Sequence, residues 1–136
     1  MNFLLDTNVA IAVIRNKPAA VRERLRAALD GGAEVAISTI ATYELWYGVA
    51  KGPRKEEGAT LVRAFLAGNF RILPFVDEDA LVAGEIRAEL GSRGTPIGPY
   101  DVLIAAQAVR GRYTLVTANV REFARVDGLI WEDWAK

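Results

Sequence analysis

The chain has 136 residues, enough for one hydrophobic core and too few for two, so we expect a single domain over residues 1–136. With 51% hydrophobic and 25% charged residues, and with 17 Lys and Arg against 17 Asp and Glu, the composition is that of a folded globular protein whose total charge favours no class of partner. The absence of cysteine and histidine excludes disulfides, thiolate chemistry, histidine general bases and the usual zinc sites.

These exclusions restrict the chemistry of an enzyme to carboxylates, hydroxyls, Lys, Arg or a bound hard cation, so oxygen-ligated Mg²⁺ or Mn²⁺ is the cofactor we expect. No apolar run reaches the roughly 20 residues that span a bilayer, and MNFLLDTN lacks the basic region and cleavage site of a signal peptide. We therefore expect a cytoplasmic protein without a membrane partner.

The first half of the chain is predicted to alternate short apolar strands with helices. FLLD and EVAIS have the composition of buried strands, Pro18 suits the first turn of one helix, and Ser38 or Thr39 can cap the next. The predicted strands are 3–6 and 34–38, and the predicted helices are 9–14, 19–30, 39–52 and 56–68. The apolar stripe of the last helix comprises Leu61, Val62, Phe65 and Leu66.

The second half continues this alternation. FRILPF and RYTLVT are predicted strands, and LIWEDW is a candidate fifth. Asp77 is expected to cap a long helix over 77–94, and the loop GTPIGP leads into a helix that begins with PYDVLIAAQA. Because parallel strands need crossover connections and are buried on both faces, we predict an α/β fold, a three-layer α/β/α sandwich with a central, mostly parallel sheet.

Three polar residues come directly after predicted strands. Asp6 follows FLL, Ser38 follows VAI and Thr117 follows TLV. In open parallel sheets the ligand crevice lies outside the carboxyl ends of the strands, so these side chains are expected at one edge. Of the three, Asp6 is the one that could bind a cation.

Two further acids lie on apolar faces of predicted helices. Glu44 is flanked by apolar residues at helical spacing, and Asp101 has Ile104 and Ala105 at i+3 and i+4. Carboxylates beside a core are costly to desolvate unless a cation or an arginine neutralises them, so one shared divalent metal would account for Asp6, Glu44 and Asp101 together. Each also has a structural interpretation: helix cap for Asp6, first-turn acid for Asp101 and arginine partner for Glu44.

Four ordered segments carry a resemblance that covers nearly the whole chain, including the closing GLIWEDW. MNFLLDTNVAIAVI, STIATYELWYGVAKG, GTPIGPYDVLIAAQA and LVTANVREF resemble the successive motifs of PIN-domain ribonucleases, specifically the VapC toxins of bacterial toxin–antitoxin pairs. The resemblance implies a PIN domain in which Asp6 and Asp101 are the principal Mg²⁺ ligands, Mn²⁺ can substitute, and Glu44 completes the acidic cluster.

The last of these motifs departs from the pattern of many PIN domains, which have an aspartate there. In this sequence Asn119 and Glu122 are the candidates. We assign Asn119 to positioning and keep Glu122 as the candidate for the fourth acid. The sequence leaves open whether Glu122 fills that position or Asn119 replaces it, and whether one or two metal ions bind.

RNKPAAVRERL, KGPRKEE and VTANVREF further resemble the VapC subgroup that cuts initiator tRNA in its anticodon stem-loop. That resemblance implies tRNA as the RNA substrate, a VapB antitoxin as partner and a homodimer. Basic residues outnumber acidic ones up to residue 55, and we expect Arg15, Lys17 and the loop 51–55 to contact RNA phosphates.

The aromatic residues of one predicted helix are more widely spread than a single core-facing stripe requires. They are Tyr43, Trp46 and Tyr47. Part of this cluster is therefore expected to form an interface, although core packing would be an ordinary use of it.

The predicted reaction is metal-assisted hydrolysis of RNA phosphodiester bonds. Mg²⁺ held by Asp6 and Asp101 would polarise the phosphate and activate water for in-line attack, with Glu44 orienting a second metal or the water. The residues that could hold these carboxylates in place, or serve only as helix caps, are Thr7, Asn8, Ser38 and Thr117.

Other families fit less well. A HAD-type phosphatase needs a second acid two residues after the first, where this chain has Asn8, and a receiver domain needs an acidic pair and a late lysine that are not found. A catalytically inactive PIN-like domain that only binds RNA or a protein ranks second, because Asp6, Glu44 and Asp101 are all present.

Overall fold

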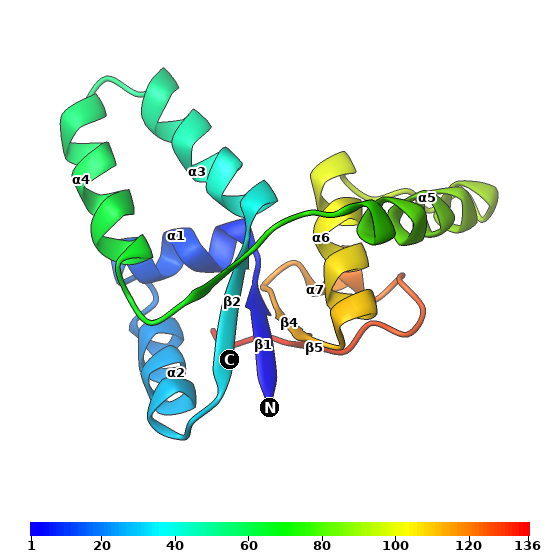
Figure 1. The fold of residues 1–136 in the computed structure, drawn as a ribbon, viewed down its shortest axis with the longest axis horizontal. Coiled ribbons are helices and arrows are strands. Elements are labelled where there is room, and N and C mark those ends of the chain that lie inside the picture. Colours follow the sequence, from blue (N-terminus) through cyan, green and yellow to red (C-terminus); the bar gives the residue numbers. More distant parts are fainter.

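The computed structural model describes residues 1–136 and confirms the predicted α/β sandwich, with strands and helices alternating along the chain (Figure 1). The elements are β1 (Asn2–Leu5), α1 (Thr7–Arg15), α2 (Ala19–Asp30), β2 (Glu34–Ser38), α3 (Thr39–Lys51), α4 (Lys55–Leu66), β3 (Arg71–Leu73), α5 (Asp77–Ser92), α6 (Pro99–Gly111), β4 (Thr114–Val116), α7 (Val120–Phe123) and β5 (Trp131–Glu132).

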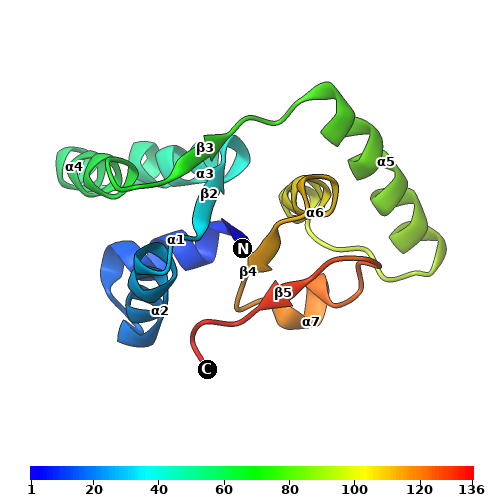
Figure 2. The same cartoon turned by 60° about the horizontal axis from the view of Figure 1, so that its bottom comes forward.

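The five strands form one parallel sheet in the order β3-β2-β1-β4-β5. Helices α1 to α4 lie on one side of the sheet, and α5 and α6 lie on the other (Figure 2). The chain runs outward from β1 to β3 and then crosses back to β4, so the direction of the crossovers reverses between β1 and β4. In parallel sheets this reversal opens a crevice at the carboxyl ends of the two strands.

The central strands are apolar throughout because both of their faces are covered. In β1 and β2, Leu4, Leu5, Ala36 and Ile37 have no exposed surface, and in β4 the same holds for Leu115. Near-continuous apolar sequence of this kind is what a doubly covered parallel strand requires. None of the helices combines the length and apolar composition needed to cross a bilayer.

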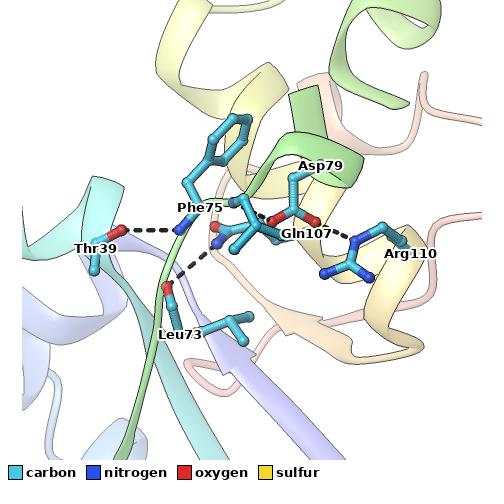
Figure 3. A network of polar contacts seen from close by, with 7 residues as sticks. Thr39, Leu73, Phe75, Asp79, Gln107 and Arg110 are labelled. Atoms are coloured by element: carbon cyan, nitrogen blue, oxygen red, sulfur yellow. Dashed lines mark hydrogen bonds and ion pairs between the residues drawn. The ribbon is translucent and has the colours of Figure 1, made fainter. Parts of the chain in front are cut away.

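Helix α6 is held from two sides by polar contacts (Figure 3). The Gln107 amide donates to the carbonyl oxygen of Leu73 at the end of β3, at 3.3 Å. Arg110 donates to Asp79 on α5, a carboxylate that is 1% exposed. Together with the burial of its apolar face, these contacts fix α6 against the sheet edge, where its first turn carries Asp101.

Two local expectations were wrong, and one short helix was missed. Asp77 does not cap α5; instead the Val76 N–H donates to Asp79, the third residue of the helix, from which a side chain can reach back to the residue before the first turn. Leu61 is 53% exposed, because α4 turns Val62 rather than Leu61 toward the core. The short helix α7, within TANVREF, was not predicted, since four residues are too few to show helical periodicity.

Candidate active site

Asp6 lies at the middle of the sheet edge, between the ends of β1 and β4. Its N–H donates to the carbonyl oxygen of Val116 at 3.1 Å, which continues the pairing of the two strands. Its side chain caps α1 by accepting a hydrogen bond from the N–H of Val9 at 2.8 Å, and the residue is only 4% exposed. Asp6 is therefore a helix cap, as its structural interpretation held, but the capping hydrogen bond uses only one oxygen of the carboxylate.

Burial raises the pKa of Asp6 to about 6. The Thr117 hydroxyl and the Val9 N–H lower this pKa, while the negative charges of Glu44 and Asp133 raise it further. A carboxylate that only capped a helix would be stabilised in its charged form, with a lowered pKa. The upward shift shows that the surroundings of Asp6 leave its charge uncompensated.

Asp101 lies in the first turn of α6 and is partly buried. Its pKa is also raised to about 6, first by burial and then by the charges of Glu122, Asp6 and Glu44. Acids contributed by four separate segments thus act on one another through space. Carboxylates that the sequence separates by up to 116 positions are therefore near enough in the structure to influence one another's charge.

Glu44 projects from α3 toward α1, where the Thr7 hydroxyl donates to its Oε1 at 2.6 Å. Thr7 begins α1 directly after Asp6, so this hydrogen bond places the Glu44 carboxylate near that of Asp6. The arginine partner of the structural interpretation is not found.

Asn119 and Glu122 form a unit at the entry to α7. The Asn119 side-chain amide donates to Glu122 Oε2 at 2.6 Å, and the Asn119 backbone N–H donates to the Thr117 hydroxyl at 2.9 Å. Through these bonds Asn119 orients the acid that acts on Asp101, which is the geometry a positioning residue needs.

The predicted supporting residues divide into two groups. Thr7 and Thr117 contact the acids or their neighbours, as described above. Ser38 caps α3 by accepting from the Ile40 N–H at 2.9 Å, and Asn8 is exposed at the adjoining groove. The helix-cap interpretation thus accounts for Ser38, whereas Thr7 holds a carboxylate.

The site is built from oxygen donors without a compensating cation. No Lys or Arg forms an ion pair with Asp6, Glu44, Asp101 or Glu122. Nor does any group of three acidic side chains converge closely enough to hold a metal ion by itself. Mg²⁺ does not require such a cage, because it usually binds one or two carboxylates and keeps waters or substrate phosphates as its other ligands. The donor chemistry and the unneutralised charge therefore fit a hard cation.

Two residues of this site were missed in the sequence. Asp133 directly follows β5, and its charge acts on Asp6; the rule that identified Asp6 and Thr117 at strand ends would also have found it. Gly98 precedes α6, and a Cβ at this position would lie 3.0 Å from Asp101 Oδ2. No local signal distinguishes Gly98 from an ordinary loop glycine.

A groove of about 960 Å³ leads away from the acids between α1, α3 and α4. Thr7 and Glu44 line one part of it, and three basic residues of its wall are Arg15, Lys51 and Arg54. Lys17, which was expected to share this role, is not among the lining residues.

The family model of the PIN domain matches residues 3–129. The tRNA(fMet)-specific endonuclease VapC of Salmonella typhimurium is 40% identical over 134 residues, with 98% of each chain covered, and the protein of the same name from Shigella flexneri is 41% identical over 138 residues, with 99% of each covered.

Solved structures agree with this assignment. VapBC2 from Rickettsia felis, bound to a DNA fragment from its promoter, contains a chain with a TM-score of 0.92 and 36% identity, covering 98% of this chain and 99% of that one. DNA-bound VapBC from Salmonella typhimurium gives a TM-score of 0.90 at 40% identity, with 98% of both chains covered. The chain therefore belongs to the PIN-domain family and, within it, to the VapC ribonucleases.

Proposed function

We propose that this chain is a Mg²⁺-dependent endoribonuclease toxin that hydrolyses RNA phosphodiester bonds. The observation that carries the proposal is the pair Asp6 and Asp101, which come from different layers of the fold and both have pKa values raised to about 6 by burial and by neighbouring acids. Burying two carboxylates near each other lowers the stability of the folded protein, and carboxylates with such raised pKa values cluster at functional sites.

The residues of the site have distinct roles in this proposal. Asp6 and Asp101 supply carboxylate oxygens for the metal, and Glu44, held by Thr7, orients the attacking water or a second ion. Bound Mg²⁺ would polarise the scissile phosphate and lower the pKa of its water. Burial of Asp6 in the crevice restricts solvent around its carboxylate, which strengthens its electrostatic interactions.

For the substrate we propose initiator tRNA, cut in the anticodon stem-loop, and for the inhibitor a VapB-type antitoxin. Support comes from the two relatives at 40% and 41% identity, which are tRNA(fMet)-specific endonucleases, and from the VapBC complexes among the similar structures. The basic wall of the groove suits a polyanionic substrate. A homodimer is part of the same proposal.

The test is cleavage of purified tRNA with Mg²⁺ and with EDTA. Asp6→Asn and Asp101→Asn should each lower the cleavage rate by more than about 100-fold, since loss of a ligand exceeds the effect typical of residues that only support one. Asp127→Asn is the control, because Asp127 is an exposed acid that pairs with Arg93 and is not among the charges that act on Asp6 or Asp101.

Cleavage that survives EDTA or either substitution would contradict the metal mechanism. Tight RNA binding without cleavage by the unmodified protein would instead support the alternative, a PIN-like binding domain without activity.

A further inference from the structure

Two exposed tyrosines stand beside the acids of the site. Tyr100 immediately precedes Asp101 on α6, and Tyr43 immediately precedes Glu44 on α3. Their rings meet edge to face, with centroids 5.6 Å apart and an interplanar angle of 68°, and their hydroxyl oxygens are 3.3 Å apart. Because α3 and α6 lie on opposite sides of the sheet, the pair bridges the two layers at the crevice (Figure 2).

The fold itself gives no reason for this pair. Tyr43 is 53% exposed and Tyr100 is 42% exposed, and neither packs against the hydrophobic core. Both rings line the groove that also contains Glu44. Exposed aromatic rings in a groove that also carries charged side chains are more consistent with ligand contact than with stabilisation of the fold.

The charges of the same groove indicate what kind of ligand the rings would meet. Arg15, Lys51 and Arg54 line its wall, so the groove presents cations and aromatic rings together. Single-stranded nucleic acids are bound by this combination, with phosphates on the cations and unstacked bases on the aromatic faces. An RNA strand whose scissile phosphate lay at the acids would place an adjacent base next to the tyrosines.

We propose that Tyr43 and Tyr100 form a base clamp, defined as these two rings, which stacks an unpaired nucleobase beside the scissile phosphate. The clamp rests on the proposed ribonuclease function and adds to it a selection rule. A base inside an RNA duplex is already stacked on its neighbours and cannot insert next to the two rings. The clamp therefore favours cleavage in single-stranded RNA loops over cleavage in base-paired stems.

The chain provides a matched control. Tyr47 lies one turn further along α3, is 57% exposed and lines the same groove, but its ring faces Lys51 rather than Tyr100. The experiment compares two kinds of variant. The first removes a ring, in Tyr43→Ala, Tyr100→Ala and Tyr47→Ala, and the second keeps the ring but removes the hydroxyl, in Tyr43→Phe and Tyr100→Phe. Thermal unfolding of each variant verifies that the fold is intact.

The substrate is a synthetic tRNA anticodon stem-loop, used intact and with an abasic nucleotide on either side of the cut. The clamp predicts that Tyr43→Ala and Tyr100→Ala lower kcat/KM by about 5- to 100-fold, while both Phe variants stay within about threefold of the unmodified protein. Tyr47→Ala keeps both rings of the clamp, so it should be as sensitive to an abasic nucleotide as the unmodified protein. The unmodified protein should lose a similar factor at one abasic position, and the Ala variants should lose little more there, because the stacking contact is already absent.

The outcomes separate the two proposals. If the unmodified protein does not cleave, the proposed function fails. If it cleaves but Tyr43→Ala and Tyr100→Ala stay within about threefold of the unmodified protein, the clamp is wrong. The clamp is equally wrong if their effects multiply with that of the abasic site, as is expected only for Tyr47→Ala. A change of oligomeric state in sedimentation that accounts for the lost activity would assign the pair to a contact between copies of the chain, which also overturns the clamp.

Discussion

Asp6 shows how one residue serves both the fold and the site. One oxygen accepts the Val9 N–H and caps α1, while burial next to other acids raises the pKa of the same carboxyl to about 6. The capping hydrogen bond favours the charged form and burial disfavours it, and burial is the larger effect. Without a cation, the ionised site therefore lowers the stability of the folded protein.

The sign of the resulting pH dependence follows from linkage. The pKa of Asp6 is higher in the folded protein than its ordinary value of 3.8, so the folded state binds more protons between about pH 4 and pH 6. Metal-free protein should lose stability as the pH rises through this range, by up to about 3 kcal/mol from Asp6 alone.

Asp6→Asn removes the charge but keeps a good helix cap. In urea unfolding with EDTA at about pH 7.5, this variant should be more stable than the unmodified protein, and its stability should change less between about pH 5 and pH 7.5. Asp127→Asn should leave the pH dependence as it is. A variant less stable than the unmodified protein at the higher pH would show that the capping charge outweighs burial.

At the scale of elements, the start of α6 depends on a glycine. Gly98 has extended backbone angles, φ −56° and ψ 146°, which any residue can adopt. An alanine is therefore acceptable to the backbone there, but its Cβ would lie 3.0 Å from Asp101 Oδ2. The carboxylate is the end of a side chain and can rotate away. The substitution should therefore disturb the site rather than the fold.

Gly98→Ala is expected to lower the cleavage rate by about 10- to 100-fold, because small misplacements of site groups are costly, while the free energy of unfolding changes by less than about 1 kcal/mol. Gly84→Ala is the control: Gly84 lies in α5, and a Cβ there meets nothing within 4 Å. Full activity of Gly98→Ala would mean that the orientation of Asp101 is not critical.

The contact between α5 and α6 makes a second prediction at this scale. Asp79→Ala removes the acceptor of both Arg110 and the Val76 N–H, and it should lower the free energy of unfolding by about 1–3 kcal/mol. This loss of unfolding free energy is smaller than that expected from breaking a fully buried ion pair, because the Arg110 side chain is 39% exposed.

The matched substitution is Asp77→Ala, two residues earlier and exposed. It should cost less than about 0.5 kcal/mol in the same denaturant titration. Equal losses for the two variants would indicate a general effect of negative charge at the start of α5 rather than the specific contacts of Asp79.

At the scale of the whole molecule, the net charge is zero, but basic residues are concentrated in one groove. Arg15, Lys51 and Arg54 line it, whereas many acids lie elsewhere. If these residues contact phosphates, the logarithm of RNA affinity should fall linearly with the logarithm of salt concentration, by about 0.7 per contact for a single strand. Replacing all three by Gln should reduce that slope by about 2.

Binding is measured with catalytically impaired Asp6→Asn protein to prevent cleavage. Arg87→Gln is the control, because Arg87 is exposed on α5, away from α3 and α4 (Figure 1). An unchanged slope in the triple variant would remove the groove from the RNA path and leave the antitoxin as its proposed occupant.

The sequence by itself determined most of the architecture. Apolar runs and helical spacing are local properties, so the strands, the long helices and their parallel arrangement could be predicted within a few residues. The position of Asp6 after its strand and of Asp101 on an apolar face also marked these acids as candidates. Helical spacing marked Glu44 in the same way, and the resemblance to VapC proteins added Asn119 and Glu122.

Only the tertiary structure decided how these groups meet. The choice of Asp79 over Asp77, the approach of Gly98 to Asp101 and the pairing of Tyr43 with Tyr100 depend on contacts between segments far apart in the chain or on the local path of the backbone. Periodicity reports which face of an element is buried, but not what that face touches. The crevice at the carboxyl ends of β1 and β4, where the direction of the crossovers reverses, exists only once the sheet has formed. The electrostatic interactions between its acids likewise require the folded chain.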